Sequence, residues 1–165
     1  MKIRKIKETA HEKEKIAQML TNFRSYLAEL KNKSDEMEIA EAVEEIDYYL
    51  DKEYPIYTAL EDNEYLGYFI LKFDDDAVWL EHFFVKEQHR GKGIGSALFK
   101  RAEEVLDELG YVNLYNWVHP NNERMINFLK SQGYDVLNMI EIRKSFENEE
   151  LKSEFKVGDN KFRYN

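Results

Sequence analysis

The segment QHRGKGIGSALF, residues 88–99, carries the strongest structural signal in the chain. It places three glycines, Gly91, Gly93 and Gly95, among basic residues and just before an amphipathic pattern that is typical of a helix. Glycine is unfavourable inside a helix, but it suits backbone that must pass close to a ligand. Successive N–H groups at the start of a helix bind anions such as phosphate. The segment therefore predicts a phosphate-binding turn where a strand leads into a helix.

Two common glycine-rich phosphate motifs do not fit this segment. The P-loop pattern G-x-x-x-x-G-K-S/T is absent, and the dinucleotide pattern G-x-G-x-x-G requires glycine at position 96, where the chain has Ser96. The dinucleotide motif also belongs to a leading βαβ unit, whereas this segment lies in the middle of the chain. What remains is a backbone cradle for one anion, with Arg90 and Lys92 beside it.

Apolar periodicity on both sides of the segment predicts an alternation of strands and helices. We expect helices at about 12–30, 35–52, 94–109 and 121–132, and strands at about 1–6, 56–60, 65–73, 77–85, 111–118 and 135–146. The strand that ends at Val85, the helix after Gly93 and the strand near Val112 form a βαβ unit, so these two strands should be parallel. In open α/β sheets, ligands bind where such a strand passes into its helix.

Composition limits the class of protein. The chain has 165 residues, 43% of them hydrophobic, which predicts a single folded domain over residues 1–165. It has no cysteine, no apolar run long enough to span a membrane and no apolar leader, so we expect a cytoplasmic protein without disulfides. The net charge of −9 disfavours nucleic acid and favours cationic partners. The four histidines lack metal-binding spacing, so no metal site is expected.

The glycine segment resembles the acetyl-CoA pyrophosphate loop of the GNAT superfamily of acyltransferases. The core of that motif is Q/R-x-x-G-x-G/A, which Gln88, Gly91 and Gly93 match. The downstream stretch NERMINFLKSQGY is similar to the second signature of the family, an asparagine followed by a helix and a Gly-aromatic pair. The resemblance covers about residues 1–145. It implies an α+β fold with a mixed, mostly antiparallel twisted sheet of about six or seven strands, one parallel βαβ crossover and about four helices; residues 146–165 would be an extension, predicted to form a β-hairpin that adds to the sheet.

The resemblance also implies where acetyl-CoA binds. The strand before the loop would contact the pantetheine arm and the thioester through Phe83, Phe84 and Val85. The loop N–H groups would hold the pyrophosphate, and the second signature would contact the pantetheine region. The cofactor-binding residues expected on this basis are Phe83, Phe84, Val85, Gln88, Arg90, Gly91, Lys92, Gly93, Ile94, Gly95, Ser96, Asn122 and Phe128.

The chemistry that the resemblance implies needs a base and an oxyanion donor. An alkyl amine has a pKa near about 10.4, so its proton must be removed before it can attack. Glu81 is our candidate base, acting directly or through a water molecule, and His82 is the alternative. Strand alternation predicts that Glu81 and His82 face opposite sides unless a bulge begins early. A bulge in this strand would free the Val85 N–H to stabilise the oxyanion.

The thiolate acid is where the chain departs from the family pattern. Many members have tyrosine seven residues after the signature asparagine, and this chain has Leu129 there. Leucine cannot donate a proton, so Tyr134, Tyr115 and Tyr26 are the remaining candidates, and Tyr134 is our choice among them. The cofactor prediction does not depend on this residue.

The function predicted from the sequence is transfer of an acetyl group from acetyl-CoA to a primary amine of a small molecule or a protein. The alternative is a non-catalytic acyl-CoA-binding domain, which Leu129 favours. Acidic residues at 41, 44, 45 and 47 on the second helix would attract a cationic acceptor if they wall the acceptor site, although a solvated helix face explains them more simply. We expect a monomer or a homodimer.

Overall fold

The structure, a computed structural model, describes residues 1–34, 36–75 and 77–164. The chain divides into two compact units. The first comprises residues 1–26 and 35–117, and the second comprises residues 27–34 and 118–165.

A five-stranded sheet forms the centre of the first unit, in the order β1-β2-β3-β4-β5. Its strands are Lys2–Lys5, Ile56–Glu61, Glu64–Asp74, Ala77–Val85 and Leu114–Tyr115. The pairs β1–β2, β2–β3 and β3–β4 are antiparallel, and β4–β5 is parallel. The predicted βαβ crossover is therefore confirmed.

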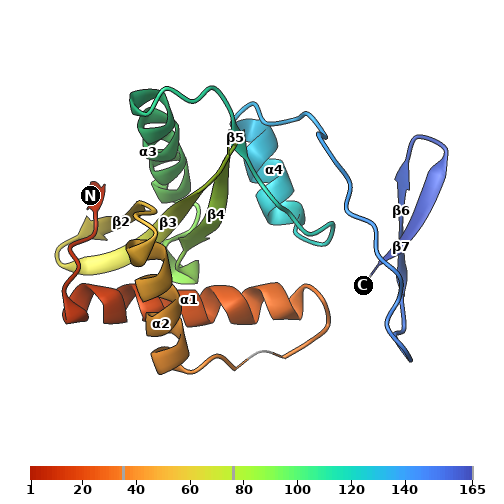
Figure 1. Ribbon diagram of the computed structural model, residues 1–165, viewed down its shortest axis with the longest axis horizontal. Helices are drawn as coiled ribbons and strands as arrows, with labels where there is room; N and C mark the ends of the chain where they lie inside the picture. The colour runs from red at the N-terminus through yellow and green to blue at the C-terminus, as the bar shows by residue number, and fades with distance from the viewer. Residues whose placement is uncertain (35, 76, 165) are drawn as a thin grey trace. The chain divides into compact units, whose positions relative to one another are not determined.

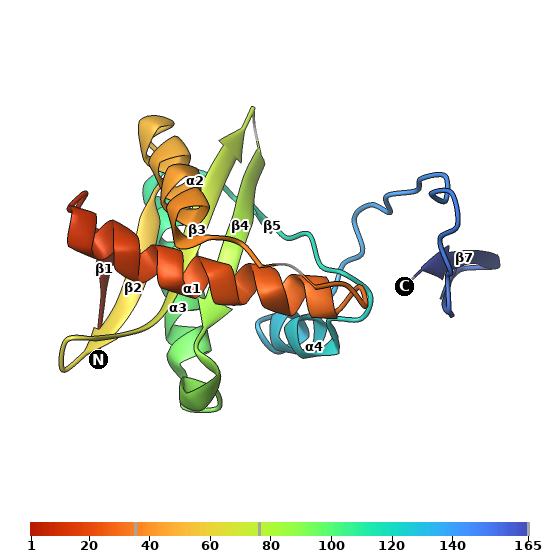
Figure 2. The ribbon, with the colours of Figure 1, turned by 90° about the horizontal axis from the view of Figure 1, so that it is seen from below.

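Helices cover both faces of this sheet (Figure 1). The helices α1 (Ala10–Glu29) and α2 (Ile39–Asp51) lie on one face, and α3 (Ile94–Glu108) lies on the other. Figure 2 shows α1 running across the strands with α2 beside it. Both helices bury their apolar stripe in one core cluster with the facing residues of the sheet, including Ile16, Leu20, Ile46, Tyr68 and Phe84.

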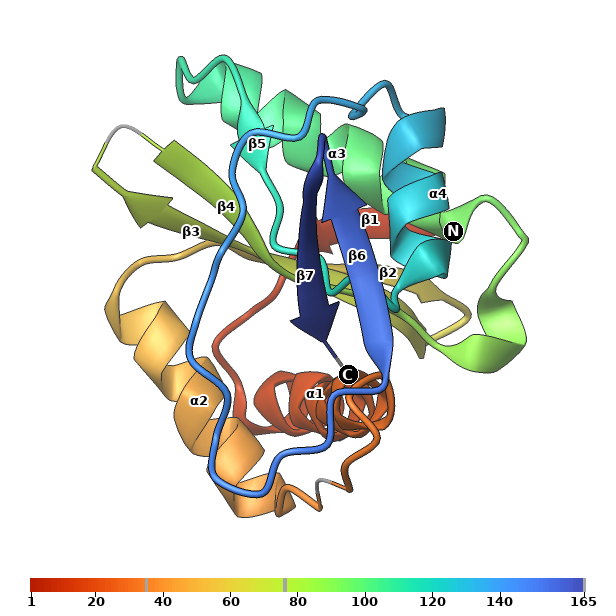
Figure 3. The same cartoon turned by 90° about the vertical axis from the view of Figure 1, so that its right-hand side faces the viewer.

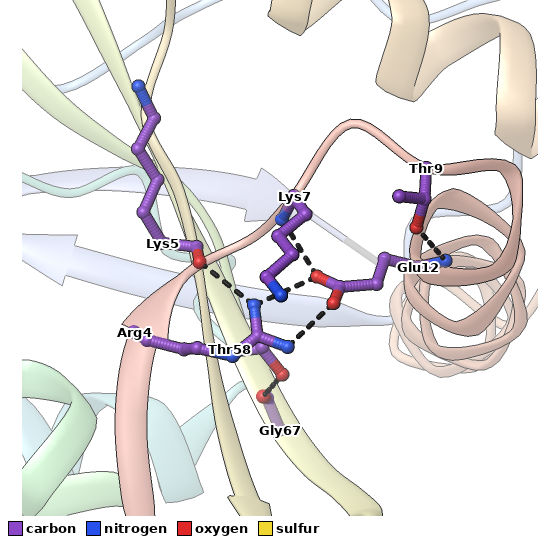
Figure 4. Close-up of polar contacts among 7 residues, drawn as sticks. All are labelled: Arg4, Lys5, Lys7, Thr9, Glu12, Thr58 and Gly67. Carbon is purple, nitrogen blue, oxygen red and sulfur yellow. Dashed lines mark hydrogen bonds and ion pairs between the residues drawn. The ribbon is translucent and has the colours of Figure 1, made fainter.

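A buried ion pair ties the first strand to the first helix (Figure 4). The Arg4 guanidinium donates to both carboxylate oxygens of Glu12, at 2.9 and 2.6 Å. The backbone N–H of Lys7 donates to the same carboxylate at 2.8 Å, and the Thr9 hydroxyl accepts from the Glu12 N–H at 3.3 Å. Glu12 is only 6% exposed, so these donors replace the water that its charge has lost.

The second unit contains one helix and one hairpin. The helix α4 spans Glu123–Ser131, and the strands β6 (Ser153–Val157) and β7 (Asn160–Tyr164) pair antiparallel, as Figure 3 shows. The register Val157↔Asn160 leaves a two-residue turn that begins with Gly158 at φ +60°. The predicted hairpin is confirmed, but it forms a sheet of its own instead of extending the five-stranded sheet.

Several predicted boundaries were wrong. The stretch 135–146 was expected to be a strand, but it forms no regular element and no described ladder includes it. Its apolar residues Val136, Leu137, Met139 and Ile142 are exposed, so the alternation reflects no buried face. The strand expected at 111–118 shrinks to Leu114–Tyr115. The start expected for the second helix, at residue 35, lies outside the described residues.

Across the described ranges, none of the helices is long and apolar enough to cross a membrane.

Candidate active site

The glycine loop meets the start of α3 in a left-handed turn. After the short 3-10 helix Glu87–His89, Gly91 has φ +75° and Gly93 has φ +81°, and Gly93 is the N-cap of α3. These torsion angles account for two of the three glycines, since other residues rarely adopt them. A Cβ on either glycine would meet no atom of the chain within 4 Å, so crowding within the chain does not require them.

The start of α3 suits an anion. The first N–H groups of an α-helix have no acceptor within the helix. Gly93 offers no side chain to cap them, and the first turn contains no acidic residue. Gly95 and Ser96 lie in this first turn, and Ile94 is buried below it. The predicted anion cradle is thus present as a conformation, with its donors and its dipole aligned.

The basic residues of the loop differ in their surroundings. Arg90 folds back onto the protein, where its Nε donates to the Val85 carbonyl at 2.9 Å and its guanidinium packs 5.5 Å from the centroid of the Tyr26 ring. Lys92 and Gln88 are exposed. Arg90 therefore braces the loop against β4, whereas Lys92 has the more solvated position beside the helix start.

Within the part of the chain that the structure describes, no strand pairs with the outer edge of β4 over its last residues. The strand β5 pairs only with Val78 and Trp79. On the inner edge, the Lys86 N–H donates to the Leu66 carbonyl at 2.9 Å. Because neighbouring residues of a strand direct their backbone groups to opposite edges, the N–H and C=O of Val85 point away from β3. The Arg90–Val85 hydrogen bond agrees with this direction. The bulge predicted to free the Val85 N–H is not at this position, because Val85 pairs regularly with Gly67; the strand alternation alone directs the N–H outward. Its role as an oxyanion donor stays a prediction.

The bulge in β4 begins at Glu81, earlier than the thioester region. His82 pairs with Ile70, but Leu80 pairs with Leu71, so Glu81 is the extra residue. Trp79, His82 and Phe84 pair with even-numbered residues of β3, so they lie on the sheet face that α1 and α2 cover. Leu80 and Phe83 lie on the opposite face, which α3 covers. Simple strand alternation would put Trp79, Glu81 and Phe83 on one face, and the bulge breaks this pattern.

The early bulge brings Glu81 and His82 to one hydroxyl. The Tyr49 Oη lies 3.3 Å from Glu81 Oε1 and 3.4 Å from His82 Nε2. Both candidate bases thus approach the same side of the sheet, which the sequence allowed only if the bulge began early.

His82 lies deep in the protein, at 2% exposure. Burial lowers the pKa of its imidazole, although the hydrogen bond with Glu45 opposes the shift. Its Nδ1 lies 3.2 Å from the Tyr68 hydroxyl and its Nε2 lies 3.2 Å from Glu45 Oε1. Glu81 is only partly buried, so it is the more accessible of the two candidate bases.

An ion pair on the α1–α2 side supports this cluster. Burial raises the pKa of the Glu45 carboxyl, but the His82 hydrogen bond and the Arg24 charge outweigh it and lower this pKa to about 2. Arg24 and Glu45 are in direct contact. Burial and the carboxylates of Glu81 and Glu45 raise the pKa of the Tyr49 hydroxyl, so Tyr49 stays protonated. Glu45 is thus an inward-facing residue, whereas Glu41 and Glu44 of the same acidic helix are exposed.

Sequence reasoning did not single out Arg24, Tyr49 or Tyr68. Tyr49 follows Ala42 and Ile46 on the buried stripe of α2, so its helical spacing could have placed it inward. Nothing in the sequence indicated that its hydroxyl would meet β4, because this contact depends on the bulge at Glu81.

The second signature lies in the second unit. Asn122 is buried and caps α4, its side chain accepting from the Met125 N–H at 3.2 Å. Phe128 is half-buried in the same helix, and Leu129 is buried. The Tyr134 N–H donates to the Leu129 carbonyl at 3.0 Å, just after the helix ends. The cofactor and acid roles predicted for Asn122, Phe128 and Tyr134 stay predictions.

The antiparallel sheet with one parallel crossover, the unpaired edge of β4 and the glycine turn before α3 together define an acyltransferase fold. The acetyltransferase (GNAT) family model matches residues 17–134, and the chain belongs to this family. It is an acetyltransferase of the GNAT type.

Solved structures share this fold at low sequence identity. A crystal structure of a probable acetyltransferase matches with a TM-score of 0.71 and 19% identity, covering 91% of this chain and all of that one. AAC(6')-Iy in complex with a CoA bisubstrate analogue matches with a TM-score of 0.69 and 14% identity, over 88% of this chain and 98% of that chain. The PaiA N-acetyltransferase of Thermoplasma acidophilum, in complex with coenzyme A, gives 0.65 and 18%, over 80% and 89%. No curated protein sequence matches significantly.

Proposed function

We propose that the chain transfers an acetyl group from acetyl-CoA to a primary amine by direct attack within a ternary complex. One observation carries the proposal: a single strand, β4, offers the Glu81 carboxylate at a bulge and, four residues later, the Val85 N–H at an edge without a ladder partner. A base and an oxyanion donor are the two groups that this reaction requires.

Each group has one role in the reaction. Glu81 accepts a proton from the amine, directly or through water, so that the nitrogen can attack the thioester carbon. The Val85 N–H donates to the developing oxyanion as the C–N bond forms. The C–S bond then breaks, the nitrogen loses its second proton to solvent to give the neutral amide, and the thiolate of CoA takes up a proton. Tyr134 remains our candidate for the group that supplies it.

The loop would hold the pyrophosphate of acetyl-CoA. The N–H groups from Gly91 to Ser96 would supply donors, and Lys92 would supply charge. The Arg90 N–H, which the sequence also predicted as a donor, instead donates to the Glu87 carbonyl at 3.1 Å. No metal ion enters the proposed reaction.

A cationic acceptor fits the surroundings of Glu81. Glu41 and Glu44 are exposed on α2, and the chain carries a net charge of −9. Trp79, on the same face of the sheet as α2, lies 4.8 Å from Trp117 between ring centroids, and Trp117 is 74% exposed. Aromatic faces attract ammonium groups. These features favour an amine that carries a further positive charge or a basic peptide.

A non-catalytic acyl-CoA-binding domain is the second candidate. Leu129 favours it, since a buried leucine stands where many family members place the tyrosine acid. The Glu81 bulge argues against it, because binding alone does not require a carboxylate beside the thioester strand.

A thiol-release assay separates the two candidates. Acetyl-CoA would be offered with polyamines, amino acids, aminoglycosides and basic peptides to the wild type, Glu81→Gln and, as a matched control, Glu14→Gln, which is exposed on α1. We expect turnover on at least one amine, a loss of about 10²-fold or more in Glu81→Gln and little change in the control. Turnover that survives in Glu81→Gln would remove Glu81 as base, and tight acetyl-CoA binding without turnover on any amine would establish the binding domain.

A further inference from the structure

A buried polar cluster lies behind Glu81 and has no role in the reaction as described so far. Its members come from α1, α2, β3 and β4: Arg24, Glu45, Tyr49, Tyr68 and His82. Tyr68 is fully buried, His82 is 2% exposed and Tyr49 is 5% exposed. Polar groups this deep need defined hydrogen-bond partners, so the direction of each hydrogen can be worked out.

We propose that Tyr49 is a positioning residue for Glu81, and that His82, fixed as its Nε2–H tautomer, directs the Tyr49 hydroxyl hydrogen to the Glu81 carboxylate. The inference rests on the proposed role of Glu81 as base. It adds a device within the protein that holds this carboxylate in place.

The partners of His82 select its tautomer. A neutral imidazole has one donor nitrogen and one acceptor nitrogen. Its Nε2 lies 3.2 Å from Glu45 Oε1, and an ionised carboxylate can only accept. The Nε2 must therefore carry the hydrogen. Its Nδ1 then accepts, and the Tyr68 hydroxyl at 3.2 Å donates to it.

The lone pairs of Glu45 Oε1 then decide where Tyr49 donates. Arg24 Nη2, His82 Nε2 and Tyr49 Oη all lie within hydrogen-bond distance of this one oxygen. A carboxylate oxygen has two lone pairs, and Arg24 and His82 fill them. The Nε2–H of His82 cannot accept from Tyr49. Glu81 Oε1, at 3.3 Å, is the acceptor that remains among these three neighbours.

The arrangement matters for catalysis because a neutral donor holds the base in one position. Tyr49 stays protonated, since burial and the two carboxylates raise the pKa of its hydroxyl. Its hydrogen bond at 3.3 Å orients the Glu81 carboxylate. The groups that face this hydroxyl are Glu45 of its own helix, Glu81 and His82 of β4 and, through Glu45, Arg24 of α1.

The kinetic test compares Tyr49→Phe and Tyr68→Phe with Tyr57→Phe, a tyrosine stacked on Phe69 of the sheet. We expect Tyr49→Phe to lower kcat about tenfold, with little change in the KM for acetyl-CoA. Tyr68→Phe should give a smaller effect of the same kind. In a Glu81→Gln background, Tyr49→Phe should have no further effect, because the two residues act as one unit. An unchanged kcat in Tyr49→Phe, or a full further loss in the Glu81→Gln background, overturns the proposal while leaving acetyl transfer intact.

A spectroscopic test needs no turnover. Nitrogen-15 NMR of the wild-type histidines distinguishes the two neutral tautomers of His82, assigned by comparison with His82→Gln. We expect the Nε2–H form in the wild type and a mixture in Tyr68→Phe. The Nδ1–H form in the wild type would overturn the proposal even if no amine were acetylated, so its failure and that of the proposed function are distinguishable.

Discussion

At the scale of single residues, the ion pair between Glu12 and Arg4 contributes to the stability of the first unit. Glu12 is 6% exposed and receives three donors from Arg4 and Lys7. The hydrogen bond from Arg4 is the main cause that lowers the pKa of its carboxyl, against the effect of burial. Its charge therefore contributes to the free energy of unfolding above the ordinary pKa of glutamate, and that contribution is lost as the pH falls through the lowered value.

Replacing Glu12 by glutamine should destabilise the fold. The substitution keeps the shape but leaves Arg4 without its anion, so we expect a loss of about 1–3 kcal/mol in the free energy of unfolding. Urea titration at neutral pH measures it, with Glu14→Gln, exposed on the same helix, as control. Equal stabilities for the two variants would show that the ion pair contributes nothing.

His82 should make stability depend on pH near neutrality. Burial lowers the pKa of its imidazole below the ordinary 6.5, so the unfolded chain binds a proton at a pH where the folded chain does not. The free energy of unfolding should therefore be highest above about pH 6.5 and fall as the pH drops below it, by up to about 1.4 kcal/mol per pH unit.

This decline can be separated from other histidines. Burial also lowers the pKa of His119, so the urea titrations would be repeated with His119→Gln. The decline should persist in that variant and disappear in His82→Gln. A free energy of unfolding that stays constant between about pH 5.5 and 7.5 in the wild type contradicts the prediction.

Among the elements, β3, β4 and α3 approach one another closely at Gly67. A Cβ on Gly67 would lie 2.5 Å from the Phe84 carbonyl oxygen and 3.1 Å from Leu98 Cδ1. The oxygen belongs to backbone, so β3 and β4 would have to separate next to Val85. The glycine therefore allows β4 to pair closely with β3 next to Val85.

Gly67→Ala should cost about 1–3 kcal/mol of stability and lower the affinity for acetyl-CoA. Thermal unfolding and calorimetric titration measure the two effects. Gly158→Asn is the control, because that position has open space and a φ of +60° that asparagine tolerates. If Gly67→Ala matched the wild type in stability and in affinity for acetyl-CoA, the prediction would be wrong.

Elements with local signals could be predicted from the sequence. The helix after Gly93 and the strand 77–85 match the structure almost to the residue, because caps, turns and periodicity are encoded nearby. The stretch 135–146 was wrongly predicted to be a strand. Its apolar residues alternate as in a strand, but among the described residues no strand pairs with it.

The candidate site was predictable only in part for a related reason. Loop chemistry around Gly91 and Gly93 is local, so the anion cradle could be read from the sequence. The bulge at Glu81 adds one residue to a pairing between two strands, and that register depends on both of them. The contact of Tyr49 with Glu81 also joins residues 32 positions apart. Such contacts need the folded chain.

For the whole molecule, the account rests on one surface of the first unit. The glycine turn, the start of α3 and the outer edge of β4 follow one another along the chain, and each presents backbone N–H groups that have no acceptor in the regular element beside them. In acetyl-CoA the pantetheine arm carries the thioester carbonyl at one end and the pyrophosphate at the other, so we expect one ligand to engage all three.

Titration of the nitrogen-15-labelled protein with acetyl-CoA, followed by the backbone amide resonances, tests this claim most directly. The account predicts that the N–H signals of Val85 and of Gly91 to Ser96 shift together and saturate at one ligand per chain. Desulfo-CoA, which keeps the pyrophosphate but lacks the thioester, should shift the loop signals and leave Val85 nearly unchanged. Saturable binding that shifts other amides and leaves these unmoved, or no binding at all, would contradict it.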